Sequence, residues 1–269
     1  MCIRDRNIII QAPPVSARKI DSLRHLQDSQ TLTLSISNVS HLDVLKKTHG
    51  RRISVLLKIP NKSDSVGFKT HEELIELIEN METLEHLRFE GLITNANEME
   101  SMEQACEVLI SAAKYLDSNS ISSDHRLLNA SNLILEKEFN DIPKGITGLI
   151  SGTYPFYTAT QNTVCSVIST VMSTPEPGKA FVDCGQKAIS IDQGVPSVIN
   201  YPDAEIEKMS AEHGYVIFDS SKLNLQIGDK ILLAPASYSG TFNLYDFVNI
   251  IEEDKLQSII PTDSRGAFK

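Results

Sequence analysis

Three consecutive stretches in the first half of the chain decide its fold class. Residues 53–59 read ISVLLKI, residues 70–80 read THEELIELIEN, and residues 87–92 read LRFEGL. The first and third are short apolar runs without regular alternation, which is typical of strands covered on both faces. The middle stretch opens with a capping box from Thr70 to Glu73 and then repeats leucine and isoleucine at helical spacing. A strand, a helix and a second strand in this order predict a parallel sheet of βα units.

The same alternation covers the whole first half of the chain. Further strands are predicted at Ile8–Gln11, Thr31–Ile36, Arg126–Asn129 and Gly145–Leu149, and further helices at Ser16–Gln27, Ser40–His49 and Met99–Leu116. Six strands before residue 150 satisfy an open doubly wound sheet. A (β/α)₈ barrel needs eight strands and about 250 residues, so a barrel would lack its first two strands here.

The chain begins abruptly. Residues 1–6 read MCIRDR, which is too short and too charged for a signal peptide, and a predicted strand follows at once. We therefore interpret residues 1–6 as an artefact and expect the native N-terminus to be absent. The first domain is then a partial barrel over residues 7–152.

The second half of the chain has a different texture. Glycine and proline punctuate a β-rich segment, which predicts an all-β domain over residues 153–269. Its strands are expected at Thr163–Ser173, Ala180–Asp183, Ala188–Ile191, Tyr215–Asp219 and Lys230–Ala234. No helix is expected between Pro155 and Gly240, and a short helix is expected around Leu244–Glu253.

Composition excludes several classes of function. The chain has 25 Lys and Arg against 35 Asp and Glu, a net charge of −10, which argues against nucleic acid as a partner. No apolar run approaches ~18 residues, so no membrane span or membrane partner is expected. The four cysteines form no CxxC pair, which favours reduced thiols in a cytoplasmic protein.

A block in the second half carries a family resemblance. Residues 178–192 read GKAFVDCGQKAISID, which resembles the G-x-A-x-x-D-x-G-x-K-A-x-S-x-D block of the D-serine dehydratase and D-threonine aldolase family. Weaker similarities follow the family's order at Ser151–Phe156, Glu212–Gly214, Ile227–Ile231 and Thr241–Tyr245. The resemblance spans about residues 7 to 250.

The resemblance implies a fold, a cofactor and a reaction. The fold would be an alanine-racemase-like (β/α)₈ barrel followed by a C-terminal β domain. The cofactor would be pyridoxal phosphate on a lysine near the end of the first barrel strand, because the chemistry needs an amine and an electron sink. The enzyme would be a lyase acting on a small amino acid, and we expect a homodimer.

Several positions depart from the family's pattern. The cofactor-binding lysine should lie upstream of residue 7, so the catalytic residues are unknown; Lys58 is the one strand-borne lysine that could replace it. Pro60 and Ser65 stand where an acidic residue and an arginine are expected. Ser131 and Asn132 occupy the phosphate-binding loop and remain candidates for binding the cofactor, although the usual glycine is missing.

The metal site of the family is also altered. Ser237 and Ser239 occupy the positions of the family's two metal ligands. A neutral hydroxyl is a poor zinc ligand beside imidazole or thiolate, so no metal is expected.

Three residues of the second half are further candidates for the cofactor site. Tyr154 lies at the domain junction, where it could approach the cofactor or simply pack as an aromatic ring. Asp183 and Lys187 belong to the best-matched block, yet an aspartate at a strand end often caps a turn, so a structural role is favoured. His213 beside Glu212 could transfer protons, but a structural histidine is favoured there as well.

Two classes of function remain open. The first is a pyridoxal-phosphate-dependent lyase of D-configured 3-hydroxy amino acids, by D-serine dehydration or retro-aldol cleavage of D-threonine. Its activity is expected to be impaired in this fragment, because an incomplete barrel leaves strand edges open and the cofactor-binding lysine is not in it. The second is a non-catalytic relative kept for binding or assembly, whose catalytic positions decayed together. A metal-free, racemase-like enzyme is a third possibility, and it would still need the upstream lysine.

Overall fold

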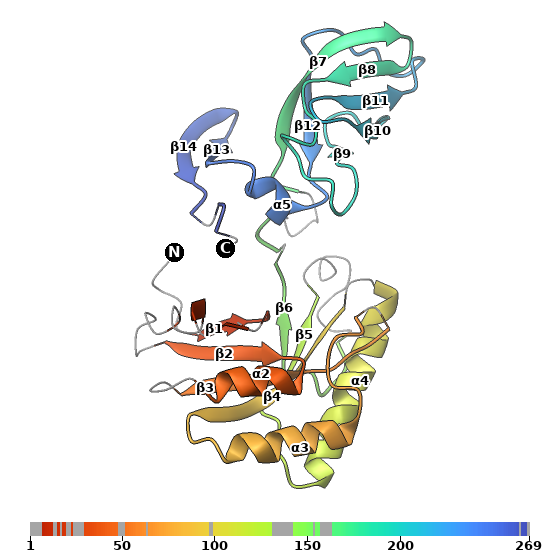
Figure 1. Cartoon of the computed structure of the whole chain (residues 1–269). Helices are drawn as coiled ribbons and strands as arrows, with labels where there is room; N and C mark the ends of the chain where they lie inside the picture. Colours follow the sequence, from red (N-terminus) through yellow and green to blue (C-terminus); the bar gives the residue numbers. More distant parts are fainter. Residues whose placement is uncertain are drawn as a thin grey trace. The chain divides into compact units, whose positions relative to one another are not determined.

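The computed structural model divides the chain into two compact units, Cys2–Pro155 and Phe156–Lys269 (Figure 1). The structure describes residues 7–12, 15–16, 18–19, 23, 30–47, 52–62, 64–96, 99–130, 142–152, 154–156, 163–263 and 265–267. Most of the predicted helix Ser16–Gln27 lies outside these residues. No helix in the described part of the chain is long and apolar enough to cross a membrane.

The first unit is built on a parallel six-stranded sheet in which every strand pairs with the next along the chain, as the βα pattern predicts. The strands are β1 (Asn7–Ile10), β2 (Thr31–Ile36), β3 (Ile53–Lys58), β4 (Leu87–Asn95), β5 (His125–Asn129) and β6 (Gly148–Ile150). This consecutive order is that of a barrel wall, whereas a doubly wound sheet reverses its strand order. The prediction of a partial barrel is therefore confirmed.

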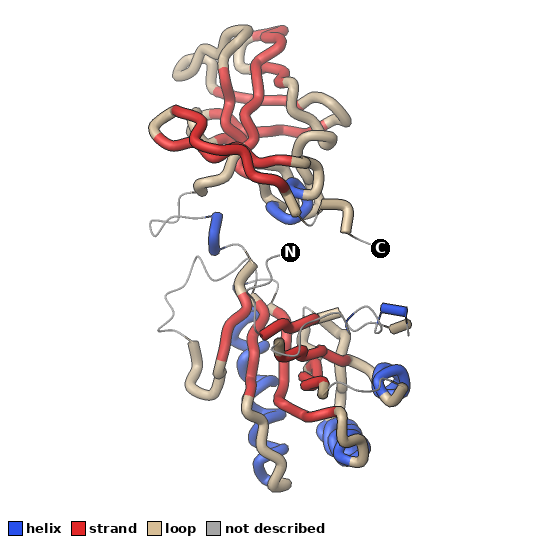
Figure 2. Tube along the Cα trace, turned by 90° about the vertical axis from the view of Figure 1, so that its left-hand side faces the viewer, coloured by secondary structure: helices blue, strands red, loops and turns tan. Residues whose placement is uncertain are grey.

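Three helices cover one face of this sheet, and Figure 2 shows them along the outer side of the strands. They are α2 (Val39–Leu45), α3 (His71–Glu82) and α4 (Met99–Ser118). The predicted capping box begins α3: the Glu73 N–H donates to Thr70 Oγ1 at 3.2 Å, and Glu73 Oε2 accepts from the Thr70 N–H at 3.4 Å. The leucines and isoleucines of α3 bury themselves against the strands, which fixes the helix on the sheet.

The other face of the sheet has a separate, thinner apolar layer. Leu56, Ile93 and Leu127 form a small cluster there with Ile150.

The register shifts within β4, so that Phe89 pairs with Val55 and Gly91 with Leu56. Glu90 is the extra residue, and its Oε1 accepts a 2.6 Å hydrogen bond from the buried Ser54 hydroxyl.

The second unit contains an antiparallel six-stranded sheet in the order β10-β11-β8-β7-β12-β9. Its strands are β7 (Val167–Glu176), β8 (Lys179–Val182), β9 (Ser197–Val198), β10 (Ala204–Met209), β11 (Gly214–Phe218) and β12 (Lys230–Ala234). Apolar side chains from β7, β8, β10, β11 and β12 form one buried core. The expectation of a β-rich second half is confirmed by this sheet.

Two of the predicted elements in the second unit are wrong. The stretch Ala188–Ile191 is a turn, in which the Ala188 and Ile189 N–H groups both donate to the Gly185 carbonyl. The expected helix at Leu244–Glu253 is instead the strand β13 (Phe247–Glu252), which pairs with β14 (Lys255–Pro261). The β-branched run of β13 fits a strand better than a helix, and a turn at Glu253 and Asp254 returns the chain.

The sequence also missed β9, β14, α5 (Tyr238–Phe242) and β10, of which the last two show why. The helix α5 is too short to show helical periodicity, and its start depends on the N-cap Ser237. The strand β10 escapes prediction because its exposed positions carry charges; it follows an alternating burial pattern for most of its length.

Candidate functional site at the carboxyl edge of the parallel sheet

The carboxyl ends of the parallel strands gather the polar side chains that make the candidate site. Lys58, Asn95 and Asn129 are the last residues of β3, β4 and β5. Gln11 directly follows β1, and Asp64 lies in the loop after β3. Barrel enzymes place their active sites at this edge, because the loops that follow the strands converge there.

An ion pair forms the charged part of this cluster. Lys58 Nζ lies 2.8 Å from Asp64 Oδ2, and the two side chains are only 18% and 15% exposed. Asp64 Oδ2 also accepts from the Asn95 amide at 2.6 Å, and Oδ1 accepts from the Val66 N–H at 3.0 Å. Burial alone would raise the pKa of Asp64, but the bonds from Lys58, Val66 and Asn95 outweigh it and lower this pKa below its usual value.

A row of amides continues the cluster across the sheet. The Asn129 amide donates to Asn95 Oδ1 at 3.0 Å and to Gln11 Oε1 at 2.8 Å. Strands β1 and β5 are separated by three others, so their ends would lie about 19 Å apart in a flat sheet. The bond between Gln11 and Asn129 therefore requires a strongly curved sheet, as in a barrel wall.

The loop after β3 is fixed to the neighbouring strand. The Asn61 amide donates to Thr94 Oγ1 at 3.0 Å, and the Thr94 hydroxyl donates to the Ile59 carbonyl at 2.7 Å. Asn61 Oδ1 in turn accepts from the Asp64 N–H at 2.9 Å. These bonds hold the Asp64 carboxylate beside Lys58 before any ligand arrives.

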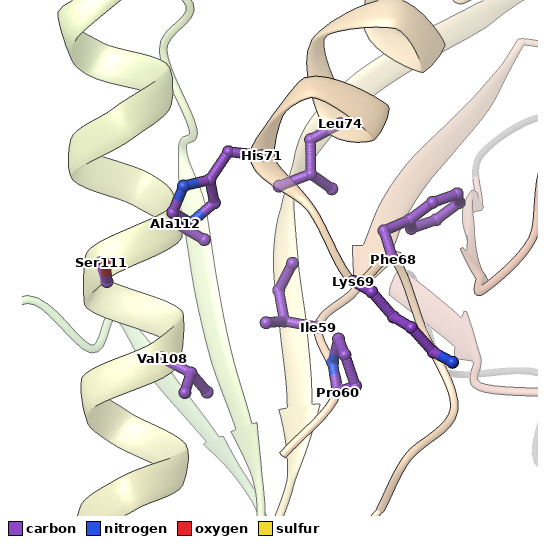
Figure 3. A pocket seen from close by; sticks show the side chains of 9 residues that line it. All are labelled: Ile59, Pro60, Phe68, Lys69, His71, Leu74, Val108, Ser111 and Ala112. Atoms are coloured by element: carbon purple, nitrogen blue, oxygen red, sulfur yellow. The ribbon is translucent and has the colours of Figure 1, made fainter.

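A small pocket lies on the helix side of the same sheet (Figure 3). Its volume is about 170 Å³, and it lies between α3, α4 and the end of β3. Figure 3 shows the His71 side chain extending toward α4, where its ring stacks on Tyr115 with the centroids 4.5 Å apart. Since Ile59, Phe68 and Leu74 belong to the core between sheet and helices, the pocket is a gap in that core.

The predicted cofactor-binding residues differ in where they lie. Ser131 and Asn132 fall outside the described residues. Tyr154 lies in the 3₁₀ turn η2 (Tyr154–Phe156), and its side chain is 65% exposed. Asp183 and Lys187 lie in the second unit, where each has its own local partners.

Asp183 joins two strands of the antiparallel sheet. Its Oδ1 accepts from the Ser169 hydroxyl at 2.8 Å and from the Thr170 N–H at 2.7 Å, both on β7. Burial would raise the pKa of Asp183, but the hydrogen bonds from Thr170 and Ser169 prevail and lower it. This geometry describes a carboxylate that fixes strand β8 to β7.

Lys187 and the histidine pair have equally local roles. Lys187 Nζ lies 2.6 Å from Glu212 Oε1, and both side chains are more than 60% exposed. His213 donates its backbone N–H to Ser210 Oγ at 3.1 Å, and its carbonyl accepts the Ser210 N–H at 2.8 Å. Glu212 thus faces Lys187, and the His213 backbone closes a tight turn with Ser210.

Ser237 and Ser239, the residues expected to match the family's metal ligands, lie at the start of α5. Ser237 is 2% exposed, and its Oγ accepts the Gly240 N–H at 3.3 Å as the helix N-cap. Hydrogen bonds from Ser190 first, and Ser237 second, lower the pKa of Asp192. Among the described residues, no three His, Cys, Asp or Glu side chains converge as metal ligands.

The described residues do not by themselves make a pyridoxal phosphate site. Among the described lysines of the first unit, Lys58 is the one that lies on a strand at this edge. Its Nζ lies 2.8 Å from Asp64 Oδ2, so the amine could attack an aldehyde only after this ion pair had been broken. Lys58 therefore does not fit the role of the cofactor-binding lysine.

The strand order, the curved sheet and the polar edge define this unit as a barrel of the alanine racemase class. A family model described as "Alanine racemase, N-terminal domain" matches residues 3–143, which is more than half of the chain. The chain therefore belongs to the alanine racemase N-terminal domain family. A second model, "Putative serine dehydratase domain", matches residues 165–251.

Curated relatives extend the similarity over nearly the whole chain. The chain is 25% identical to a 3-hydroxy-D-aspartate aldolase of Paracoccus denitrificans (strain Pd 1222), over 92% of this chain and 70% of that protein. It is 22% identical to a D-threonine aldolase of Arthrobacter sp, over 97% of this chain and 74% of that protein. The resemblance inferred from residues 178–192 is thus confirmed.

Solved structures share the fold. The D-threonine aldolase from Filomicrobium marinum matches with a TM-score of 0.79 at 22% identity, over 98% of this chain and 78% of that one. The D-threo-3-hydroxyaspartate dehydratase from Delftia sp. HT23 matches with a TM-score of 0.76 at 16% identity, over 94% and 78% of the two chains. These matches establish a partial barrel followed by a β domain.

Proposed function

We propose that this chain acts as a pyridoxal-phosphate-dependent lyase on D-configured 3-hydroxy amino acids. One observation carries the proposal. The first half of the chain matches the alanine racemase model, the second half matches the serine dehydratase model, and the curated relatives over both halves are named as aldolases of such amino acids. The cofactor would supply the electron sink that stabilises a carbanion next to the substrate's amino group. Ser131 and Asn132 remain the proposed contacts to its phosphate.

The edge cluster is the proposed place for the amino acid. Lys58 has three N–H bonds, and one of them is directed to Asp64. The others are suited to a substrate carboxylate, and the amides of Asn95 and Asn129 can orient the substrate's polar groups. Because Asp64 is itself fixed by Asn95 and by the Val66 N–H, it holds Lys58 in place for this contact.

We propose further that the reaction needs no metal ion. Ser237 accepts a helix N–H and Ser239 is exposed, so neither presents the thiolate, imidazole or carboxylate that zinc prefers. We also propose a cytoplasmic homodimer in which Tyr154 remains a candidate cofactor contact. Asp183 and Lys187 are assigned structural roles in the second unit.

The test uses the protein expressed from its natural reading frame and incubated with pyridoxal phosphate. A lyase should acquire a visible absorbance band that borohydride bleaches, and should cleave 3-hydroxy-D-aspartate or D-threonine. Glycine plus an aldehyde would indicate retro-aldol cleavage, whereas ammonia plus a keto acid would indicate dehydration. A chain that gains no band and cleaves neither substrate contradicts the proposal.

A non-catalytic relative is the second candidate, and one observation favours it. The strand-borne lysine at the edge is paired with Asp64 at 2.8 Å, so its amine is already engaged. A non-catalytic protein would show neither the bleachable band nor lyase activity, yet it would still bind amino acids at the edge cluster. Isothermal titration with 3-hydroxy-D-aspartate separates this candidate from an unrelated function.

A further inference from the structure

The edge cluster consists of Lys58, Asp64, Asn95, Asn129 and Gln11, and its hydrogen bonds run in one direction. Asp64 fixes this direction, because a carboxylate in an ion pair accepts hydrogen bonds and donates none. Its Oδ2 lies 2.8 Å from Lys58 Nζ and accepts from the Asn95 amide at 2.6 Å. Asn95 must therefore turn its NH₂ group toward Asp64 and its Oδ1 away from it.

The same direction continues along the amide row, which we define as Asn95, Asn129 and Gln11. Asn95 Oδ1 needs a donor, and Asn129 Nδ2 supplies it at 3.0 Å. The same Asn129 NH₂ group donates to Gln11 Oε1 at 2.8 Å. A side-chain amide has two N–H bonds, so Asn129 uses both on its two neighbours. Gln11 consequently turns its oxygen toward Asn129 and its NH₂ group away from the row.

This polarity leaves the edge cluster rich in free donors. Lys58 has three N–H bonds, of which Asp64 takes one. Within the described part of the chain, nothing accepts from the second N–H of Asn95 or from the Gln11 NH₂ group. The oxygens of Asp64, Asn95 and Gln11, by contrast, each already accept a hydrogen bond. Gln11 is exposed to solvent, so a ligand can reach its NH₂ group.

A surface of free donors selects the chemistry of its ligand. A carboxylate offers two acceptor oxygens and no donor, and its bonds to N–H groups are charge-assisted. An ammonium group would meet oxygens that are already engaged and would be repelled by Lys58. An amino acid at this edge is therefore held through a carboxylate, with its amino group directed away from Lys58.

We propose that the amide row makes the edge cluster a carboxylate-binding site, in which Gln11 is the specificity-determining residue. Lys58 supplies the charge, and Gln11 supplies the outermost donor of the row. The inference deepens the proposed function and rests on it for the identity of the substrate. It adds which group of the amino acid this edge binds and which side chain selects that group.

The first test measures malate binding by isothermal titration to the protein expressed from its natural reading frame. Malate has the carbon skeleton, the hydroxyl and both carboxylates of 3-hydroxyaspartate but no amino group, so it can bind without being cleaved. We expect saturable binding, and the neutral diamide of malate should bind at least about tenfold more weakly.

The decisive variant is Gln11→Glu. It keeps the oxygen that accepts from Asn129 but replaces the free NH₂ group by a negative oxygen. Malate should bind at least about tenfold more weakly, because a carboxylate then faces a carboxylate. The matched control is Gln226→Glu, which adds the same charge at an exposed position of the second unit and should leave the Kd for malate unchanged.

A second measurement reports the contact directly. The side-chain NH₂ signal that Gln11→Glu removes from the ¹H–¹⁵N spectrum identifies Gln11 in the unmodified protein. This signal should shift on addition of malate and not on addition of the diamide at the same concentration. Absence of malate binding, a Gln11 signal that saturating malate leaves in place, or a Gln11→Glu variant that binds malate normally would each overturn the proposal.

These outcomes are separable from those of the lyase proposal. A protein that gains no cofactor band but binds malate through Gln11 supports the carboxylate site and contradicts the lyase. A protein that cleaves 3-hydroxy-D-aspartate, and whose Gln11→Glu variant keeps the same KM, overturns the role of Gln11 alone.

Discussion

At the residue scale, the ion pair between Lys58 and Asp64 is the main charged feature at the carboxyl edge of the parallel sheet. It lies where a barrel enzyme binds its ligand, and it is held by neighbouring amides and backbone N–H groups. The sequence shows Lys58 at the end of a predicted strand, but it gives no sign that Asp64 turns back to meet it. Loop geometry decided that pairing, through Asn61 and Thr94.

Asp64→Asn should destabilise the first unit by about 1–3 kcal/mol at pH 7, because it leaves a half-buried ammonium without its counter-ion. The folded state lowers the pKa of Asp64, so its contribution is present above the unfolded pKa and disappears as pH falls through the folded one. Urea unfolding at pH 7 and at acid pH should therefore show a penalty that vanishes in acid.

The matched control for this pair is Asp124→Asn. Asp124 pairs with Arg88 at 3.3 Å on the surface, where both side chains are about half exposed. Its loss should change stability by less than about 0.5 kcal/mol. Equal penalties for the two variants would contradict the role assigned to Asp64.

Asp183 offers a second test at this scale. Asp183→Ala should cost about 1–2 kcal/mol, because the Thr170 N–H and the Ser169 hydroxyl lose their acceptor. Lys187→Ala, which removes an exposed pair, should cost less than about 0.5 kcal/mol. Thermal unfolding measures both. A variant of Asp183 with unchanged stability and abolished cofactor binding would instead support a direct role in the site.

At the scale of elements, the bulge in β4 shows how one glycine shapes the sheet. Gly91 has φ of +156°, and a Cβ there would clash with the His125 carbonyl oxygen on β5. Gly91 directly follows the extra residue Glu90, and its lack of a side chain permits the close approach of the β5 backbone there. The sequence predicted the strand but placed no bulge in it.

Gly91→Ala should therefore destabilise the chain by more than about 2 kcal/mol, through the clash and the backbone strain together. Gly228→Ala is the matched control, since Gly228 also has a positive φ but a Cβ added there would meet no atom within 4 Å. The control should cost about 1 kcal/mol, from strain alone. Denaturant midpoints of the two variants, compared at equal slope, measure the difference.

The short helix α5 tests the assignment of Ser237. Ser237→Ala should cost about 1 kcal/mol, because the Gly240 N–H loses its cap within a buried site. Ser239→Ala should be nearly neutral, since Ser239 is exposed. Thermal unfolding measures both effects on stability. If the two serines were metal ligands instead, both variants would lower the metal content of the purified chain and leave its stability unchanged.

At the scale of the whole molecule, the proposed reaction should resist chelation. Dialysis against EDTA should leave the rate of 3-hydroxy-D-aspartate cleavage unchanged, because the N-cap Ser237 and the exposed Ser239 offer only neutral hydroxyls to a metal ion. Metal analysis of the purified chain should find far less than one zinc ion per chain. A rate that falls with EDTA and recovers with added zinc would show that other residues hold a metal.

The sequence by itself determined the parallel sheet, its helices and the β-rich second half. Apolar runs, capping residues and turn glycines act over a few neighbouring residues, so their pattern can be read locally. The block at residues 178–192 identified the family for the same reason, because its spacing lies within one short segment. Where the local signal was weak or β-branched, as in α5 and β13, the prediction failed.

Only the tertiary structure decided the edge cluster and the register of the β13–β14 hairpin. Gln11 and Asn129 are 118 residues apart in the chain, and they meet because the sheet curves. Phe247 and Ile259 share a face only in the register that the turn at Glu253 and Asp254 imposes. Long-range contacts of this kind depend on curvature, register and loop geometry, and no local pattern of residues encodes them.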